Sequence, residues 1–139
     1  MGGPTRRAAT AAFVERALGV LAVESPAAYH RLADQLRRAP TGLEVDDESF
    51  RVEVQGDLIG VVRRPLRHGG GRVTAGGAVI LDLIDGRTSL LEAVLEGRLN
   101  VHGDPDAVLA LARGLTAFVE GAVRSPALRD LLEEYRAAM

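Results

Sequence analysis

Residues 86–104 constrain the fold of this chain more than any other stretch, because they combine two helix starts, a helix end and a short strand. Ser89 followed by Glu92 forms a capping box, in which the hydroxyl and the carboxylate satisfy free amides at the start of a helix. Gly97 lies where that helix has to end, since glycine adopts a left-handed conformation without steric cost. Asp104-Pro105 is typical of the start of a second helix.

Apolar residues in this stretch follow first a helical period and then a strand period. Helical spacing predicts one buried helix face, formed by Leu90, Leu91, Val94 and Leu95. Alternation with polar neighbours then predicts a strand with one buried face, formed by Leu99, Val101 and Gly103. The stretch is therefore expected to fold as a short helix, a strand and the beginning of a longer helix.

The same residues carry a resemblance to the sterol carrier protein type 2 domain family. That family shows a glycine, a short helix with an alanine near its end, a Gly-basic-Leu-x-hydrophobic-x-Gly strand, a polar cap and a long apolar helix. The matching positions are Gly86, Ala93, Gly97-Arg98-Leu99-Asn100-Val101-His102-Gly103, and Asp104 leading into Val108, Leu109 and Leu111. The resemblance implies an α+β domain with a mainly antiparallel, twisted five-stranded sheet covered by helices.

Composition sets wider limits on fold and function. A length of 139 residues, 47% of them hydrophobic, suits one domain (residues 1–139) with an aliphatic core. The net charge of −2 disfavours nucleic-acid binding, and the absence of cysteine excludes disulfides and thiol chemistry. The basic cluster Arg63, Arg64 and Arg67 is interpreted as the solvated edge of a hairpin.

No apolar run approaches the roughly 20 residues that span a bilayer. Arg6-Arg7 is compatible with an export signal, but Glu15-Arg16 interrupts the apolar stretch behind it. A cytoplasmic location is therefore expected.

Helices are expected at both ends of the chain. After residues 1–4, expected to be disordered, one helix covers about residues 5–23 and a second runs from Ser25-Pro26 to Pro40. These N-terminal helices (residues 5–40) extend beyond the usual start of the family. Residues 106–123 and the segment after Ser125-Pro126 are also predicted to be helical.

Strand signals occupy the middle of the chain. Alternating residues predict strands at 43–45, 50–55, 58–62 and 72–75, the first three forming an antiparallel meander. Residues 78–84 have a strand-like composition, whereas the family resemblance places a short helix there, which we favour. The glycine-rich residues 68–77 are interpreted as a connector, because they lack the spacing of a phosphate-binding loop.

Helix 106–123 is apolar on more than one side and therefore needs two covers. The sheet supplies one cover, and a ligand, a partner chain or the final helix is expected to supply the other. The final helix has its own apolar stripe, formed by Leu128, Leu131, Leu132 and Tyr135.

Candidate reactive residues have simpler structural explanations. His30, His68 and His102 lack metal-ligand spacing and are interpreted as solvated. The acidic run at residues 46–48 fits a hairpin turn better than a cation site. Asp82 and Asp85 would serve as general bases if buried, but a helix at 78–84 turns Asp82 towards water. We therefore expect no metal, no cofactor and no catalytic activity.

The resemblance implies non-catalytic binding or transfer of a hydrophobic small molecule, such as a lipid, a fatty acyl or an isoprenoid-like compound, in an apolar tunnel. Its expected wall consists of Phe50, Val52, Val54, Ile59, Val61, Ile84, Leu91, Leu99, Val101, Leu115, Phe118 and Val119. The alternative is an accessory module that forms a homodimer or docks on an enzyme through its apolar C-terminal helices. A third interpretation is an enzyme whose pocket shields a reactive intermediate.

Overall fold

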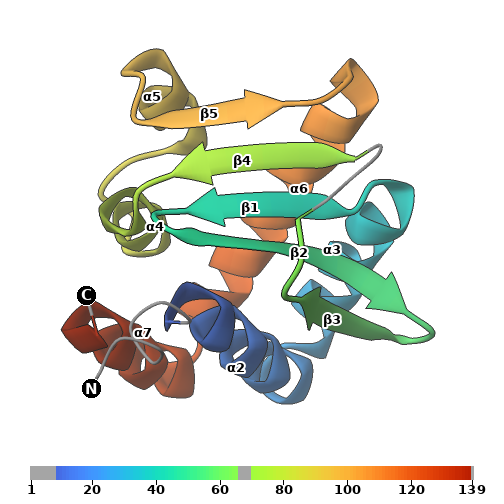
Figure 1. Cartoon of the computed structure of the whole chain (residues 1–139). Helices are drawn as coiled ribbons and strands as arrows, with labels where there is room; N and C mark the ends of the chain where they lie inside the picture. Colours follow the sequence, from blue (N-terminus) through green and yellow to red (C-terminus); the bar gives the residue numbers. More distant parts are fainter. Residues whose placement is uncertain (1–8, 66–69, 139) are drawn as a thin grey trace.

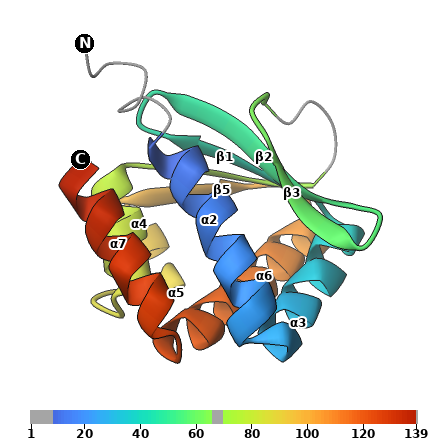
Figure 2. The same cartoon turned by 90° about the horizontal axis from the view of Figure 1, so that it is seen from below.

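A computed structural model describes residues 9–65 and 70–138. This part of the chain forms a five-stranded sheet and six helices. The sheet is twisted and open, and the helices gather on one of its faces (Figures 1 and 2). The expected α+β class, with a mainly antiparallel sheet covered by helices, is confirmed.

The sheet has the strand order β3-β2-β1-β4-β5. Its strands are β1 (Thr41–Val45), β2 (Glu48–Gln55), β3 (Leu58–Val62), β4 (Gly71–Ala75) and β5 (Leu99–His102). The first three form the predicted antiparallel meander, and β5 is antiparallel to β4. β4 runs parallel to β1, so the chain crosses from the edge strand β3 to the other side of β1.

The helices are α2 (Ala9–Glu24), α3 (Pro26–Arg38), α4 (Gly77–Ile84), α5 (Leu90–Leu95), α6 (Pro105–Val123) and α7 (Pro126–Ala138). The ambiguous residues 78–84 lie in α4, as favoured. Ser25 and Pro26 begin α3 at the predicted position, although the Ser25 side chain makes no capping hydrogen bond.

The signals for helix starts and ends in residues 86–104 are found in the structure. The Ser89 hydroxyl accepts a hydrogen bond from the Glu92 amide at 3.1 Å, and the Asp104 carboxylate accepts one from the Ala107 amide at 2.8 Å. Gly97 has a φ of +72°, and the Arg98 amide donates to the Ala93 carbonyl, which closes α5 in a Schellman motif. Each boundary is therefore set by residues close to it in sequence.

The predicted buried face of α5 is wrong for three of its four residues, since only Leu90 is partly buried, against the cluster of Val73 and Leu99. Ala93 is fully buried, whereas Leu91 and Leu95 are 67% and 76% exposed and Val94 is also exposed. The helix has six residues, fewer than two turns, and lies beside β5 at the margin of the sheet (Figure 1). In so short a helix, Ala93 and the partly buried Leu90 are the residues that pack towards the sheet.

The second cover of α6 differs from all three that we expected. It is α3, which packs along a row of small residues on α6, namely Ala107, Ala110, Gly114, Ala117 and Gly121. A Cβ atom on Gly121 would lie 2.3 Å from the Leu21 Cδ1 atom, and one on Gly114 would lie 3.2 Å from the Leu32 Cδ1 atom. The N-terminal helices are thus part of the core.

The larger apolar side chains of α6 are only partly buried. Leu111 and Leu115 contact a small cluster built on Val73 and Leu99 of the sheet, and Phe118 contacts the main core. The narrow face of α6 is therefore packed most tightly, and its bulky faces lie at the borders of the core.

Three expectations fall outside the described residues. They concern the disorder of residues 1–4, the exposure of His68, and Arg67 in the arginine cluster. Arg63 and Arg64 are exposed at the end of the β2–β3 hairpin, and Arg63 pairs with Glu15 of α2.

Candidate functional site

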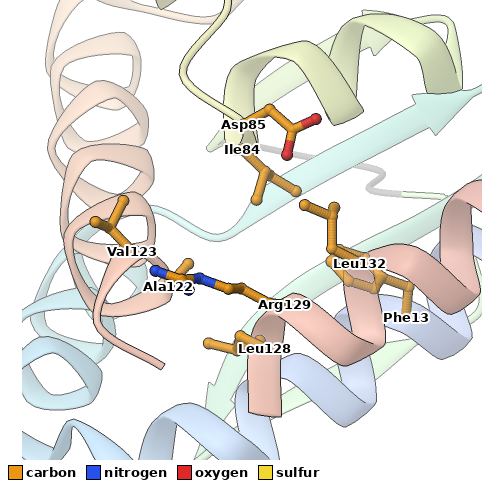
Figure 3. A pocket seen from close by; sticks show the side chains of 8 residues that line it. All are labelled: Phe13, Ile84, Asp85, Ala122, Val123, Leu128, Arg129 and Leu132. Carbon is orange, nitrogen blue, oxygen red and sulfur yellow. The ribbon is translucent and has the colours of Figure 1, made fainter. Parts of the chain in front are cut away.

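An apolar pocket of about 220 Å³ lies between α7, the end of α6, the end of α4 and α2 (Figure 3). Four helices thus contribute to one site at the end of the main core. The lining residues are Phe13, Ile84, Asp85, Ala122, Val123, Leu128, Arg129 and Leu132. Six of these eight are apolar, and the two charged residues are Asp85, directly after α4, and Arg129 on α7.

The start of α7 is fixed by Ser125, which is 1% exposed. Its hydroxyl accepts a hydrogen bond from the Leu128 amide at 3.1 Å and donates one to the Glu24 carboxylate at 2.7 Å. The serine therefore caps α7 and ties it to the end of α2. This anchor places Leu128 and Leu132, one helical turn apart, against the pocket.

The other end of α7 is held by Tyr135. Its ring stacks on Phe13 with centroids 4.7 Å apart, and its hydroxyl shares a 2.7 Å hydrogen bond with the Thr10 hydroxyl. Burial raises the pKa of Tyr135, and the negative charges of Glu48 and Asp46 raise it further, while the hydrogen bond from Thr10 acts in the opposite direction. The phenol therefore remains neutral at physiological pH.

The acidic turn at residues 46–48 supports the same end of the molecule. The Glu48 carboxylate accepts hydrogen bonds from the amides of Thr10 and Ala11 at 2.8 and 3.0 Å, in the first turn of α2. The Asp46 carboxylate accepts one from the Gly77 amide at 3.2 Å. The predicted turn is confirmed, and these carboxylates bind backbone amides.

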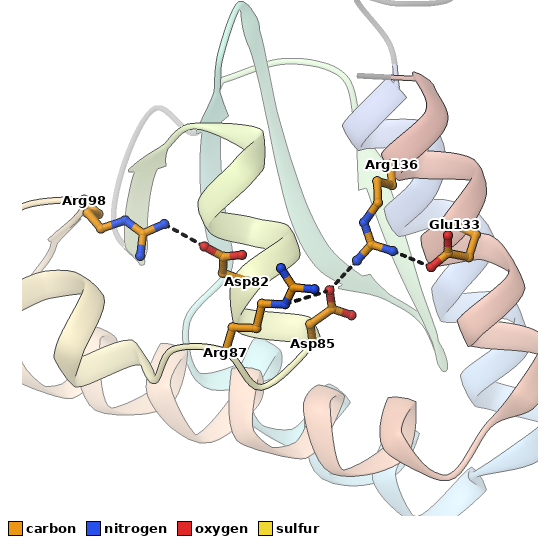
Figure 4. Close-up of polar contacts among 6 residues, drawn as sticks. All are labelled: Asp82, Asp85, Arg87, Arg98, Glu133 and Arg136. Carbon is orange, nitrogen blue, oxygen red and sulfur yellow. Dashed lines mark hydrogen bonds and ion pairs between the residues drawn. The ribbon is translucent and has the colours of Figure 1, made fainter.

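Charged residues on and around α4 and α7 form ion pairs, and one of them, Asp85, lines the pocket (Figure 4). Asp85 pairs with Arg136 of α7, which also pairs with Glu133, and lies 4.0 Å from Arg87. Asp82, on the same helix as Ile84, forms a 2.7 Å ion pair with Arg98, and this hydrogen bond raises the pKa of the guanidinium. Both carboxylates considered as general bases are thus held in surface ion pairs.

Most of the expected wall residues pack against one another instead of lining this pocket. Three are buried in the main core and four are partly buried against it: Phe50, Val52 and Ile59, then Val54, Val61, Ile84 and Phe118. The second cluster contains or borders three more, Leu99, Val101 and Leu115. Val119 is half-buried on α6 and Leu91 is exposed on α5. Of the twelve, Ile84 lines the pocket.

Sequence reasoning missed the other residues of the pocket. The stripe of α7 and the position of Phe13 in a helix are both readable from the sequence. Nothing in a periodic pattern says that α2 packs beside α7, because their contact joins residues more than 100 positions apart. The expected tunnel between sheet and helices stays a prediction.

Other candidate residues gather into no reactive site. His30 and His102 are exposed, as expected. Within residues 9–65 and 70–138, no group of three histidine or acidic residues is placed to hold a metal ion. In the same ranges, no helix is both long enough and apolar enough to cross a bilayer.

The fold can be compared with that of known proteins. The sequence matches no protein-family model and no curated protein sequence. A ubiquinone synthesis protein, UbiJ-SCP2, is similar in structure, with a TM-score of 0.64 and 20% identity over 83% of this chain and 92% of that one. Sterol carrier protein domain 2 of Helicoverpa armigera gives a TM-score of 0.59 at 14% identity, covering 78% of this chain and 89% of the other.

A third similar structure is sterol carrier protein 2 from Yarrowia lipolytica in its apo form, with a TM-score of 0.53 and 15% identity over 78% of this chain and 88% of that one. These matches cover most of both chains. The chain therefore has the fold of the sterol carrier protein 2 domains, as the residues around Gly97 implied.

Proposed function

We propose that this chain binds a small hydrophobic molecule in the pocket under α7 and carries it without chemical change. The observation that supports this function most strongly is the pocket itself, which six apolar side chains line at the end of the core. The similar structures include proteins named sterol carriers and a ubiquinone synthesis protein, names that refer to hydrophobic compounds.

Binding would be driven by desolvation. Each methylene moved from water into an apolar site contributes about 0.8 kcal/mol, so a chain of several carbons offsets the cost of association. Six of the eight lining residues are apolar and two are charged, and a mostly apolar lining with a few polar groups is typical of ligand sites. Asp85, the carboxylate that lines the pocket, is paired with Arg136.

The size of the pocket gives α7 a role in uptake. Its volume of about 220 Å³ is below the roughly 300–1,000 Å³ of most ligand sites. An engineered cavity of about 150 Å³ takes one benzene. A longer ligand therefore requires α7 to shift away from α4 and α6, and the cited ion pair across this border, between Arg136 and Asp85, lies near the surface, where such pairs contribute little.

A pair of valine substitutions tests the site. Val123 lines the pocket and is 60% exposed, so Val123→Phe places a ring in the mouth with little effect on folding. Val23 is 79% exposed on α2 and does not line the pocket, which makes Val23→Phe the matched control.

The readout is native mass spectrometry of the protein purified from its own host, followed by extraction of bound lipids. We expect a hydrophobic compound to accompany the unchanged protein and the Val23→Phe variant and to be depleted in Val123→Phe. Equal retention by both variants would place the ligand elsewhere, and the absence of any bound compound, with no binding of added alkyl probes, would refute the function.

The alternative role, docking or dimerisation through the C-terminal helices, gains no support from the described contacts. The small-residue face of α6 is covered by α3, and the apolar stripe of α7 is buried against α2 and the core.

A further inference from the structure

Arg129 differs from Asp85, the other charged residue that lines the pocket, in its ionic contacts. It is exposed on α7 and lines the pocket, and Figure 3 shows its side chain reaching from α7 towards Ala122 of α6. Within the described residues its guanidinium takes part in no hydrogen bond or ion pair. An arginine without a partner thus lies across the opening of an apolar pocket.

The neighbouring carboxylates already have partners of their own. Asp85, the other charged lining residue, pairs with Arg136. Glu133 lies one helical turn beyond Arg129, at a spacing suited to an ion pair with it, but it also pairs with Arg136. Arg136 therefore pairs with both acidic groups, and the positive charge of Arg129 at the pocket has no ion-pair partner among the described residues.

We propose that Arg129 determines ligand specificity by binding an anionic head group, a carboxylate or a phosphate, at the end of a ligand whose apolar chain enters the pocket. This assignment rests on the proposed function. A guanidinium offers five donors in a planar fork that matches either anion. The six apolar lining residues suit the chain, so the pocket and its mouth together fit an amphiphile with one charged end.

The alternative ligand is a neutral apolar molecule of similar size. Such a ligand would gain the same desolvation energy from the pocket and nothing from Arg129. The two cases separate when the chain is kept constant and the head group is changed, because only an anion responds to the guanidinium.

The test measures, by titration calorimetry at low salt, the binding of octanol, octanoate and octyl phosphate to the whole protein and two variants. Arg129→Gln removes the charge at the mouth. Arg113→Gln removes an equal charge from an arginine of α6 that lines a separate groove towards α3. Both arginines are exposed, so thermal unfolding of both variants is expected to match that of the unchanged protein.

We expect both anions to bind about fivefold more weakly to Arg129→Gln than to the unchanged protein, the effect of one partly exposed ion pair. The affinity for octanol should remain unchanged, and Arg113→Gln should behave as the unchanged protein does. A response to octanoate alone or to octyl phosphate alone would identify which head group is bound. The preference should also decrease as salt is added.

Two results would overturn the assignment. If Arg129→Gln weakens the binding of octanol as much as that of the anions, or weakens the binding of none of the three, then Arg129 does not bind the head group. The pocket would still bind alkyl chains in that case. If none of the three probes binds to the unchanged protein, the proposed function fails and this assignment fails with it.

Discussion

The contact between α6 and the N-terminal helices predicts opposite effects for the same substitution at two glycines. Gly121 is buried on α6, where a Cβ atom would lie 2.3 Å from the Leu21 Cδ1 atom and 3.0 Å from the Ala28 Cβ atom. Gly19 lies in the interior of α2, exposed, with nothing within 4 Å of an added Cβ atom. Replacing each by alanine adds one methyl group to a helix in both cases.

The magnitudes follow from two competing effects. Alanine favours a helix over glycine by about 1 kcal/mol, so Gly19→Ala should stabilise the protein by roughly 0.5–1 kcal/mol. At Gly121 the same gain is opposed by overpacking, which costs about 1–3 kcal/mol or more. Leu21 is fully buried, and Ala28 has no rotamer that moves its Cβ atom, so α3 itself has to shift. We therefore expect Gly121→Ala to destabilise the protein by a net ~1–2 kcal/mol.

Differential scanning calorimetry and urea unfolding measure both effects. For a chain of this size, 1 kcal/mol corresponds to about 3–4 °C in Tm. Gly19→Ala should raise Tm by ~2–3 °C, and Gly121→Ala should lower it by ~3–7 °C. An increase for Gly121→Ala equal to that for Gly19→Ala would show that α6 does not approach α2 and α3 this closely, and the packing described for the core would be refuted.

Three further predictions concern single residues. Because the pKa of Tyr135 is raised above 10.0 in the folded state, its stabilising contribution is complete below about pH 10 and is lost as the pH rises through the folded-state pKa. Between about pH 9 and 11, urea unfolding should therefore show a smaller loss of stability for Tyr135→Phe than for the unchanged protein. Equal losses of stability in the two proteins would contradict this. Ser89→Ala should cost about 1 kcal/mol and speed amide exchange in α5, as seen by hydrogen-exchange mass spectrometry, and unchanged exchange would show that the cap is not needed. Leu95→Ser should change the free energy of unfolding by less than about 0.5 kcal/mol, because Leu95 is exposed. Leu99→Ala, at a buried site, should lower the free energy of unfolding by ~2–5 kcal/mol. Similar losses at the two positions would contradict the orientation of α5.

Local features of the fold could be predicted because the groups that create them are close in sequence. Ser89 caps the amide three residues later, Asp104 does the same, and Gly97 ends a helix by its own backbone conformation. Strand alternation in β2 and the short turns of the meander act over similar distances. These signals were sufficient to place several helix and strand boundaries, whereas the sheet class and the helix at residues 78–84 were predicted from the family resemblance.

The assembly of the helices could not be predicted in the same way. The hydrogen bond between Thr10 and Tyr135 spans 125 positions, and no local pattern specifies it. Helix periodicity also misled at α5, where a run of leucines suggested a buried face and the smaller Ala93 takes that place. On α6 the prediction of buried faces relied on the bulky apolar residues, although Gly114 and Gly121 mark the face that packs most tightly.

The same two causes, long-range helix contacts and misleading periodicity, limited the prediction of the candidate site. Phe50 and Val52, predicted on the sheet side of a tunnel wall, are core residues in the structure, and the tunnel itself stays a prediction. The pocket depends on Phe13 and Leu132, which meet only because α2 and α7 lie side by side. A site formed between helices from opposite ends of a chain becomes visible only once their packing is known.

The proposed function requires that the pocket beside α7 binds an apolar molecule. The most direct test is the dissociation constant of a series of straight-chain carboxylates of increasing length, measured by titration calorimetry on the whole protein. Each added methylene should lower the constant by about fourfold until the pocket is filled, after which the values should level off. Dissociation constants that do not change with chain length would contradict the central claim.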